Sequence, residues 1–243
     1  MSNPALSFGP AAREYDRLRP PYPAEAVEWA VGGPPPRVVV DLGAGTGILT
    51  RVLLAAGYAA VPVEPDTDMR DQLAAATPGS RALAGSAEAV PLPDGSVGAV
   101  VSGQAYHWFE RDLAHAEAAR LLAPGGSFAA VWNNRDDDEP WVAALSRLAK
   151  AYGDVPHEAP TSFGSRFTRV EHRTFHHATP MTGADLVAMM TTRSYYLTAP
   201  APRRRAFEAE LRELVETHPD VAGRDRFPLP YRTEVYRAST LRS

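Results

Sequence analysis

Three glycines at alternating positions follow a short apolar run near residue 40. The segment Val38 to Gly47 is VVVDLGAGTG, in which Asp41 closes the apolar run and Gly43, Gly45 and Gly47 follow. Glycine is needed where the backbone takes a positive φ or comes close to a ligand. Because ligands of open α/β sheets bind beyond the carboxyl ends of the strands, this turn is predicted to be a binding site.

A second acid stands where the next strand is expected to end. Glu64 comes about 20 residues after Gly43, the spacing at which a carboxylate accepts hydrogen bonds from ribose hydroxyls. An adenosine-containing ligand is therefore predicted. The third glycine, Gly47, comes one residue too early for the dinucleotide fingerprint, which has a glycine where Ile48 stands. Asp41, just before the turn, suits a positively charged amine of the ligand. We favour S-adenosylmethionine over a dinucleotide or a turn that binds nothing.

One histidine is a candidate for the chemistry of methyl transfer. This reaction is an in-line displacement at a sulfonium carbon, so it mainly requires alignment of the reactants. His107 follows the fourth expected strand, and the ordinary pKa of histidine, about 6.5, suits general-base catalysis at neutral pH. The alternative is a structural role beside Trp108. The aromatic neighbours Tyr106, Trp108 and Phe109 either line an acceptor pocket or fill the core.

Apolar runs and helix-like segments alternate along the first half of the chain. Strands are expected at residues 37–42, 59–64, 81–85, 97–102 and 127–132, and helices at 24–31, 47–56, 67–76 and 113–122. This alternation is typical of βαβ units, which form a doubly wound sheet with right-handed crossovers. The glycine turn, Glu64 and His107 then all lie at carboxyl ends of strands.

The second half continues with strands expected at 167–177 and 233–239 and helices at 141–152, 183–192 and 203–217. No linker separates these elements from the rest, so we expect one domain over residues 1–243. Its expected parts are an N-terminal arm or lid (1–36), a cofactor-binding core (37–133), a substrate-side insertion (134–166) and closing strands and helices (167–243).

Composition excludes several classes of protein. The chain has 243 residues, of which 44% are hydrophobic and 22% charged, which is typical of a globular fold and not of a disordered chain. A net charge of −4 indicates neither a nucleic acid nor a membrane surface as partner. Cysteine is absent, which excludes disulfides and thiolate chemistry. Without a signal-like N-terminus or a long apolar run, a cytoplasmic protein is expected.

Two groups of residues raise the question of a metal site. Gln104, the asparagines that follow Trp132 and the acidic turn 136–138 do not match the carboxylate-rich coordination that Mg²⁺ prefers. His172 and His176 share one face of an expected strand, but no third ligand stands near them in the sequence. We therefore predict no metal.

Several motifs together resemble those of class I S-adenosylmethionine-dependent methyltransferases. They are DLGAGTG (41–47), VEP (63–65), GSAE (85–88), PLPD (91–94), QAYHWF (104–109) and LLAPGG (121–126), in the family's order. More narrowly, YDRLRPPYP (15–23) and QAYHWF resemble the small-molecule group that includes trans-aconitate methyltransferase-like proteins. The resemblance implies a Rossmann-like α/β fold. It has a seven-stranded, mostly parallel sheet ending in a reversed hairpin, helices on both faces and a small cap.

The resemblance also implies how the cofactor is held. Gly43, Ala44 and Gly45 pass beneath its methionine part, with Asp41 near the amine and Gln104 near the sulfonium. Around the adenosine part, the resemblance places Glu64 at the ribose and Pro65 and Met69 beside the adenine. It places Ser86 and Ala87 at the adenine amino group. Relatives often have Asp where Ser86 stands. In the arm, Tyr15 or Arg19 reaches the methionine carboxylate, unless the arm only packs on the surface.

The implied activity is transfer of a methyl group to an oxygen, nitrogen or carbon of a small-molecule acceptor, leaving S-adenosylhomocysteine. The acceptor is expected to lie against Tyr22, Tyr106, Trp108, Trp132 and Asn133. Two alternatives stay open, an NAD(P)-dependent Rossmann oxidoreductase and a module that binds the cofactor without catalysis. A monomer or a homodimer is expected.

Overall fold

The computed structural model describes residues 16–241. They divide into two compact units. The sheet unit comprises residues 21–133, 158–175 and 233–241, and the helical unit comprises 16–20, 134–157 and 176–232. The single domain and the four segments expected from the sequence stay predictions. Within the described part of the chain, no helix is both long and apolar enough to cross a membrane.

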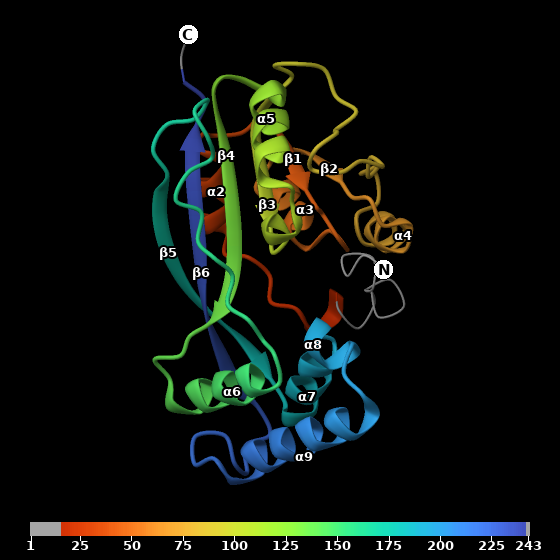
Figure 1. The fold of residues 1–243 in the computed structure, drawn as a ribbon, viewed down its shortest axis with the longest axis vertical. Coiled ribbons are helices and arrows are strands. Elements are labelled where there is room, and N and C mark those ends of the chain that lie inside the picture. Colours follow the sequence, from red (N-terminus) through yellow and green to blue (C-terminus); the bar gives the residue numbers. More distant parts are fainter. Residues whose placement is uncertain (1–15, 242–243) are drawn as a thin grey trace. The chain divides into compact units, whose positions relative to one another are not determined.

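One six-stranded sheet has the order β2-β1-β3-β4-β6-β5. Its strands are β1 (Val38–Leu42), β2 (Ala59–Val63), β3 (Val97–Gly103), β4 (Leu122–Arg135), β5 (Glu171–Met181) and β6 (Phe227–Ser239). The first four in this order are parallel neighbours, and β6 runs opposite to β4 and β5 (Figure 1). The mostly parallel sheet with a reversed hairpin is confirmed.

The expected count of seven strands is wrong. Residues 81–85 form only an isolated parallel bridge, Val63 to Leu83. Two hydrogen bonds make it, from Leu83 N to Pro62 O (2.9 Å) and from Glu64 N to Leu83 O (3.1 Å). Leu83 is the one large apolar residue in this segment and packs against the core. A single anchoring side chain supports a bridge beside β2 but no longer ladder.

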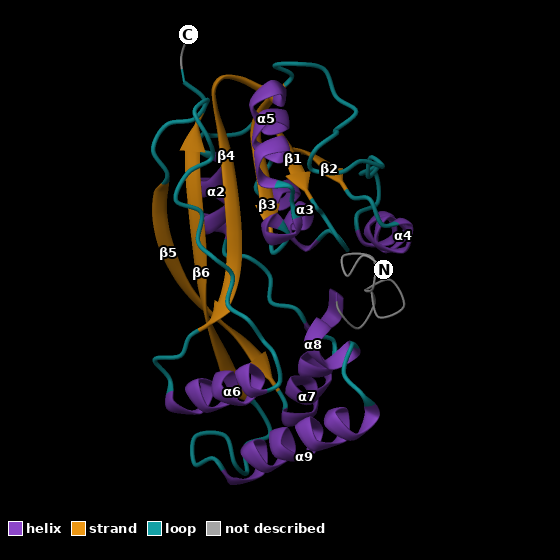
Figure 2. Ribbon diagram, viewed as in Figure 1, coloured by secondary structure: helices purple, strands orange, loops and turns teal. Residues whose placement is uncertain are grey.

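Helices cover both faces of the parallel strands, as Figure 2 shows. They are α2 (Ala24–Val31), α3 (Ile48–Ala55), α4 (Thr67–Ala76), the 3₁₀ helix η3 (Tyr106–Trp108) and α5 (Arg111–Leu121). Neighbouring strand residues point to opposite faces. Val39 packs in a cluster with residues of α2 and α3, whereas Val40 packs in a cluster with residues of α5. Val39 and Val40 of β1 are therefore buried on opposite faces of the sheet.

The helical unit contains α6 (Pro140–Ala151), α7 (Gly183–Thr191), α8 (Ser194–Leu197) and α9 (Ala201–Thr217). Its core includes Leu145, Met189, Leu211 and Tyr231. A capping box begins α7, where Thr182 Oγ1 accepts from Asp185 N (3.0 Å). The short helix α8 was not expected, because four residues are too few to show helical periodicity.

Candidate functional site

The glycine turn after β1 has the backbone that its sequence predicts. Gly43, Gly45 and Gly47 have φ values of 73°, 55° and 85°, a region that L side chains rarely adopt. A Cβ atom on Gly43 would lie 2.6 Å from Ala105 Cβ, and one on Gly47 2.9 Å from Leu73 Cγ. Nothing lies within 4 Å of the same position on Gly45. A ligand can therefore approach the backbone at Gly45.

Asp41 lies at the base of this turn with 1% of its surface exposed. Its Oδ2 accepts a hydrogen bond from Thr50 Oγ1 (2.6 Å), whereas Oδ1 has no partner among the described residues. Burial raises the pKa of Asp41 to about 7, and the neighbouring charge of Glu64 adds to the effect. A buried carboxylate oxygen without a donor fits a positively charged group of a ligand.

Glu64 links the end of β2 to the glycine turn. Its Oε2 accepts from Gly45 N and its Oε1 from Asp66 N, both at 2.9 Å. Burial raises the pKa of Glu64, although the two N–H donors favour the ionised form. Each carboxylate oxygen has a second lone pair, so the same orientation leaves capacity for two hydroxyl donors.

Pro65 and Met69 follow Glu64 closely in the chain. Pro65 is exposed, whereas Met69 is 6% exposed in the first turn of α4. Asp66 begins that helix by accepting from Met69 N (3.0 Å). The structure thus holds Met69 beside the carboxyl end of β2, and its expected place beside the adenine stays a prediction.

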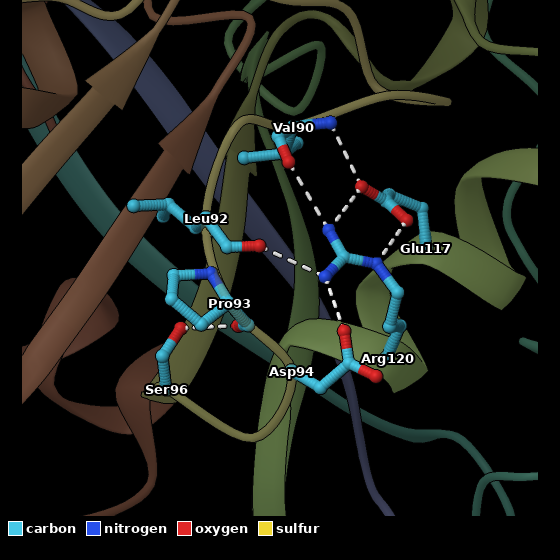
Figure 3. Close-up of polar contacts among 7 residues, drawn as sticks. All are labelled: Val90, Leu92, Pro93, Asp94, Ser96, Glu117 and Arg120. Carbon is cyan, nitrogen blue, oxygen red and sulfur yellow. Dashed lines mark hydrogen bonds and ion pairs between the residues drawn. The ribbon is translucent and has the colours of Figure 1, made fainter.

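Ser86 and Ala87 begin a tight turn closed by mutual backbone hydrogen bonds between Ser86 and Ala89 (3.3 Å each). The loop that follows is fastened to α5 by Arg120 and Glu117, as Figure 3 shows. Arg120 donates to Leu92 O (2.8 Å), Val90 O (3.1 Å) and Asp94 Oδ1 (2.6 Å), and Glu117 Oε1 accepts from Val90 N (2.8 Å).

Sequence analysis missed this network. Glu117 and Arg120 stand three residues apart on a helix, which is the spacing of an ordinary surface ion pair. This network differs from a surface ion pair because backbone carbonyls of the loop accept hydrogen bonds from Arg120. Such backbone acceptors leave no pattern in the sequence of residue types.

At the ends of β3 and β4 the structure brings Tyr22, Gln104 and Asn133 together. Gln104 is the one non-glycine residue with positive φ (57°) among residues 16–241, and its side chain donates to Asn133 O (2.9 Å). Asn133 Nδ2 donates to Pro21 O (3.2 Å). A Cβ atom on Gly103 would lie 2.6 Å from Tyr22 Oη. Strained backbone of this kind concentrates at functional sites.

Thr233, on β6, completes this cluster by donating to Asn133 Oδ1 (2.6 Å). It was missed because it lies 100 residues from Asn133 in the sequence and matches no motif. Only the sheet order, in which β6 neighbours β4, brings the two side chains together.

The predicted aromatic residues of the acceptor site separate into two groups. Tyr106 and Trp132 are 1% and 3% exposed and pack edge to face at 5.8 Å. Tyr106 Oη also bonds His115 Nε2 (2.9 Å), so both rings fill the core. His107 is half-buried against Trp108, with ring centroids 4.7 Å apart, and Trp108 is 42% exposed. Only this second pair is open to a ligand, and the role of each residue stays a prediction.

Of the two predicted arm contacts, Tyr15 lies outside the described residues. Arg19 belongs to the helical unit, where its Nη2 donates to Thr192 Oγ1 (3.5 Å). Its expected role at the methionine carboxylate therefore stays a prediction.

Comparison with known proteins decides the family. Residues 40–130 match the model described as "Methyltransferase domain". A putative type II methyltransferase from Anaeromyxobacter dehalogenans shares the fold, with a TM-score of 0.66, 23% identity and coverage of 93% of this chain and 99% of that one. An uncharacterized methyltransferase from Mycobacterium tuberculosis is 40% identical over 235 residues, or 97% of this chain and 96% of the relative.

The chain belongs to the class I S-adenosylmethionine-dependent methyltransferases. This confirms the expected enzyme class and cofactor, and excludes the oxidoreductase alternative. Half of the methyltransferase chain also resembles a malonyl-[acyl-carrier protein] O-methyltransferase from Methylococcus capsulatus, at 38% identity over 140 residues, 51% of this chain and 49% of the relative. The narrower likeness to trans-aconitate methyltransferase-like proteins stays a prediction.

Proposed function

We propose that this methyltransferase holds S-adenosylmethionine at the glycine turn and transfers its methyl group to a small-molecule acceptor. The observation that carries the proposal is the pairing of two buried carboxylates around Gly45. Asp41 has an oxygen that accepts from no donor among residues 16–241, and Glu64 is oriented by the Gly45 N–H. Both stand at carboxyl ends of neighbouring parallel strands, where such folds bind their ligands.

On the cofactor side, each residue has a distinct role in this proposal. Asp41 attracts the amine of the methionine part, and Glu64 accepts from the two ribose hydroxyls. The adenine lies between Pro65 and Met69 and is read by the turn at Ser86 and Ala87, which is followed by the loop that Arg120 fastens to α5. When bound, the cofactor supplies an activated methyl group on a sulfonium.

On the acceptor side, the chain's own residues align the nucleophile and handle its proton. Gln104 and Asn133 offer fixed polar groups at the ends of β3 and β4. Tyr22 lies in the same cluster, and Trp108 offers an exposed apolar surface. His107 acts as the base or orients the acceptor. The name of the Methylococcus relative supports an oxygen nucleophile as the first candidate.

Titration calorimetry with S-adenosylhomocysteine and with NAD tests the cofactor assignment. We expect S-adenosylhomocysteine to bind and to raise the melting temperature, whereas NAD does neither. Glu64→Ala should weaken binding about tenfold or more, because two hydroxyls lose a charged acceptor. Glu213→Ala, which removes an exposed acid on α9, is the matched control. Unchanged affinity in Glu64→Ala would place the ribose elsewhere.

A screen with methyl-labelled cofactor over small-molecule acceptors tests catalysis. Label transfer to at least one acceptor is expected. Tight cofactor binding without any transfer across alcohols, acids, amines and activated carbons would instead support a non-catalytic binding module.

A further inference from the structure

In the helical unit, two arginines and one acid act electrostatically on a third arginine, Arg193. Arg135 extends from the end of β4 and donates to Asp154 Oδ2 (2.7 Å) and Ser146 Oγ (3.0 Å). Burial opposes ionisation of Asp154, but Arg135 and Arg193 hold its pKa below the ordinary value. This carboxylate is therefore charged and is already paired with Arg135.

Arg193 forms no such ion pair with the residues that the structure describes. It directly precedes α8, and its Nε is buried with no hydrogen-bond partner in the part of the chain that the structure describes. Burial lowers the pKa of Arg193 to about 10, and repulsion from Arg19 and Arg135 adds to the effect. Removing a guanidinium from water without pairing it is costly.

The hydroxyl of Tyr195, two residues after Arg193, also lacks a hydrogen-bond partner. It is buried and bonds to no other described residue. Burial raises the pKa of Tyr195 to about 12, so the hydroxyl stays a donor at neutral pH. Gly153, at φ 108°, passes beside this residue, since a Cβ atom there would lie 3.7 Å from Tyr195 Cβ.

The charges around Arg193 do not cancel. Arg19, Arg135 and Asp154 are the charged groups that act on it. With Arg193 itself, the group contains three cations and one carboxylate. Burial lowers the pKa of His157, which therefore adds no cation at neutral pH. A bound oxyanion would accept from both orphaned donors and neutralise the excess charge.

We propose that Arg193 and Tyr195, supported by the charge of Arg19, form a binding site within the helical unit for a small-molecule oxyanion, a carboxylate or a phosphate. Binding at this site needs no turnover, so it can be tested even if methyl transfer is never detected.

Titrations with inorganic phosphate and with succinate, against sodium chloride at equal ionic strength, test the site. Calorimetry and thermal unfolding should show binding and a raised melting temperature in the intact chain. Arg193→Gln should weaken both anions about tenfold or more and melt no lower than the intact chain in anion-free buffer, since an unpaired buried charge is removed. Arg205→Gln, an exposed arginine on the same unit, should behave as the intact chain.

Tyr195→Phe keeps the test valid if Arg193→Gln does not fold. Removing a hydroxyl that has no partner should leave the stability unchanged while weakening both anions several-fold. No anion binding by the intact chain, equal binding by both variants and the intact chain, or a clear loss of stability in anion-free Arg193→Gln would each overturn the proposal.

The cofactor also carries a carboxylate, so its contribution must be separated. S-adenosylhomocysteine and its decarboxylated analogue are titrated into the intact chain and Arg193→Gln. Equal affinity of S-adenosylhomocysteine for both supports a site for an oxyanion other than the cofactor carboxylate. Loss of affinity only for the form with the carboxylate would assign Arg193 to the cofactor and overturn the proposal.

Discussion

The sheet unit and the helical unit each bury charge without a full set of partners, but with opposite signs. In the sheet unit Asp41 and Glu64 are buried carboxylates with raised pKa values. In the helical unit Arg193 is a partly buried guanidinium, with its Nε buried and its pKa lowered. The first site suits a cationic ligand group and the second an anionic one.

The two sites differ in how they are built. The carboxylates are oriented by backbone N–H groups of a turn that follows directly on a strand. The arginines come from three segments far apart in the sequence and are held by side-chain contacts such as Arg135 with Asp154. A substitution removes a side-chain contact but leaves a backbone N–H in place. Substituting the residues that orient each site should therefore disturb the arginines more than the carboxylates.

The largest effect is expected at His107, because its substitution distinguishes a residue that takes part in catalysis from one that only binds a ligand. His107→Ala should lower kcat by about 10²–10⁴-fold if the imidazole moves a proton, with little change in affinity for S-adenosylhomocysteine. Arg193→Gln should instead weaken the binding of phosphate and succinate. Single-turnover rates, with and without added imidazole to replace the lost ring, measure the effect of His107→Ala.

Near-normal turnover of His107→Ala would make the ring structural, and transfer would then depend on proximity alone. Loss of cofactor affinity would move His107 into the cofactor site. A pH–rate profile without an inflection near 6–7 would argue for orientation of the acceptor.

Asp41→Asn should remove a pH dependence that Arg193 cannot produce near neutrality. Since the pKa of Asp41 is raised to about 7, the folded chain keeps a proton that the unfolded chain releases above about pH 4. Its contribution to the free energy of unfolding falls as pH rises from 4 to 7, by at most about 1.4 kcal/mol per unit, and is level above. Urea unfolding at pH 5 and 8 measures it, with Asp71→Asn, exposed on α4, as control.

Cofactor binding should show the opposite slope. A cationic amine prefers the ionised Asp41, so the affinity for S-adenosylhomocysteine should rise through pH 7 in the intact chain and stay flat in Asp41→Asn. Equal slopes in the two proteins would remove Asp41 from the amine site.

A smaller effect is expected where an arginine of the sheet unit is well paired. Arg120→Ala breaks the bonds to Val90, Leu92 and Asp94, and should destabilise the chain by about 1–3 kcal/mol. Affinity for S-adenosylhomocysteine should fall several-fold through the displaced turn at Ala87. Arg111→Ala, which loses an exposed ion pair to Glu158 and a contact over the Tyr106 ring at 5.7 Å, should cost at most about 1 kcal/mol and leave the affinity unchanged. Destabilisation with intact affinity would separate this loop from the cofactor.

The smallest change in stability is expected at Trp108. Because 42% of its surface is exposed, Trp108→Ala should alter the free energy of unfolding by less than about 1 kcal/mol. Trp132→Ala should cost about 3–5 kcal/mol, since that ring is fully packed. A raised KM for the acceptor in Trp108→Ala supports the exposed pair as the acceptor surface, and an unchanged KM counts against it.

The sequence by itself determined the glycine turn, the two carboxylates and most elements. The helices at 24–31 and 67–76 have the expected bounds, and the turn has the positive φ values that its glycines predict. These features depend on residues adjacent in the chain, where the spacing of apolar side chains and the steric freedom of glycine act locally.

Only the tertiary structure decided which groups meet across long distances. It reduced residues 81–85 to a bridge, buried Tyr106 and Trp132 in the core, and joined Thr233 to Asn133. It also brought Arg19, Arg135 and Asp154 close enough for their charges to act on Arg193. A pattern of residue types does not specify such pairings, because burial and charge depend on the packing of distant segments, and that packing exists only in the folded chain.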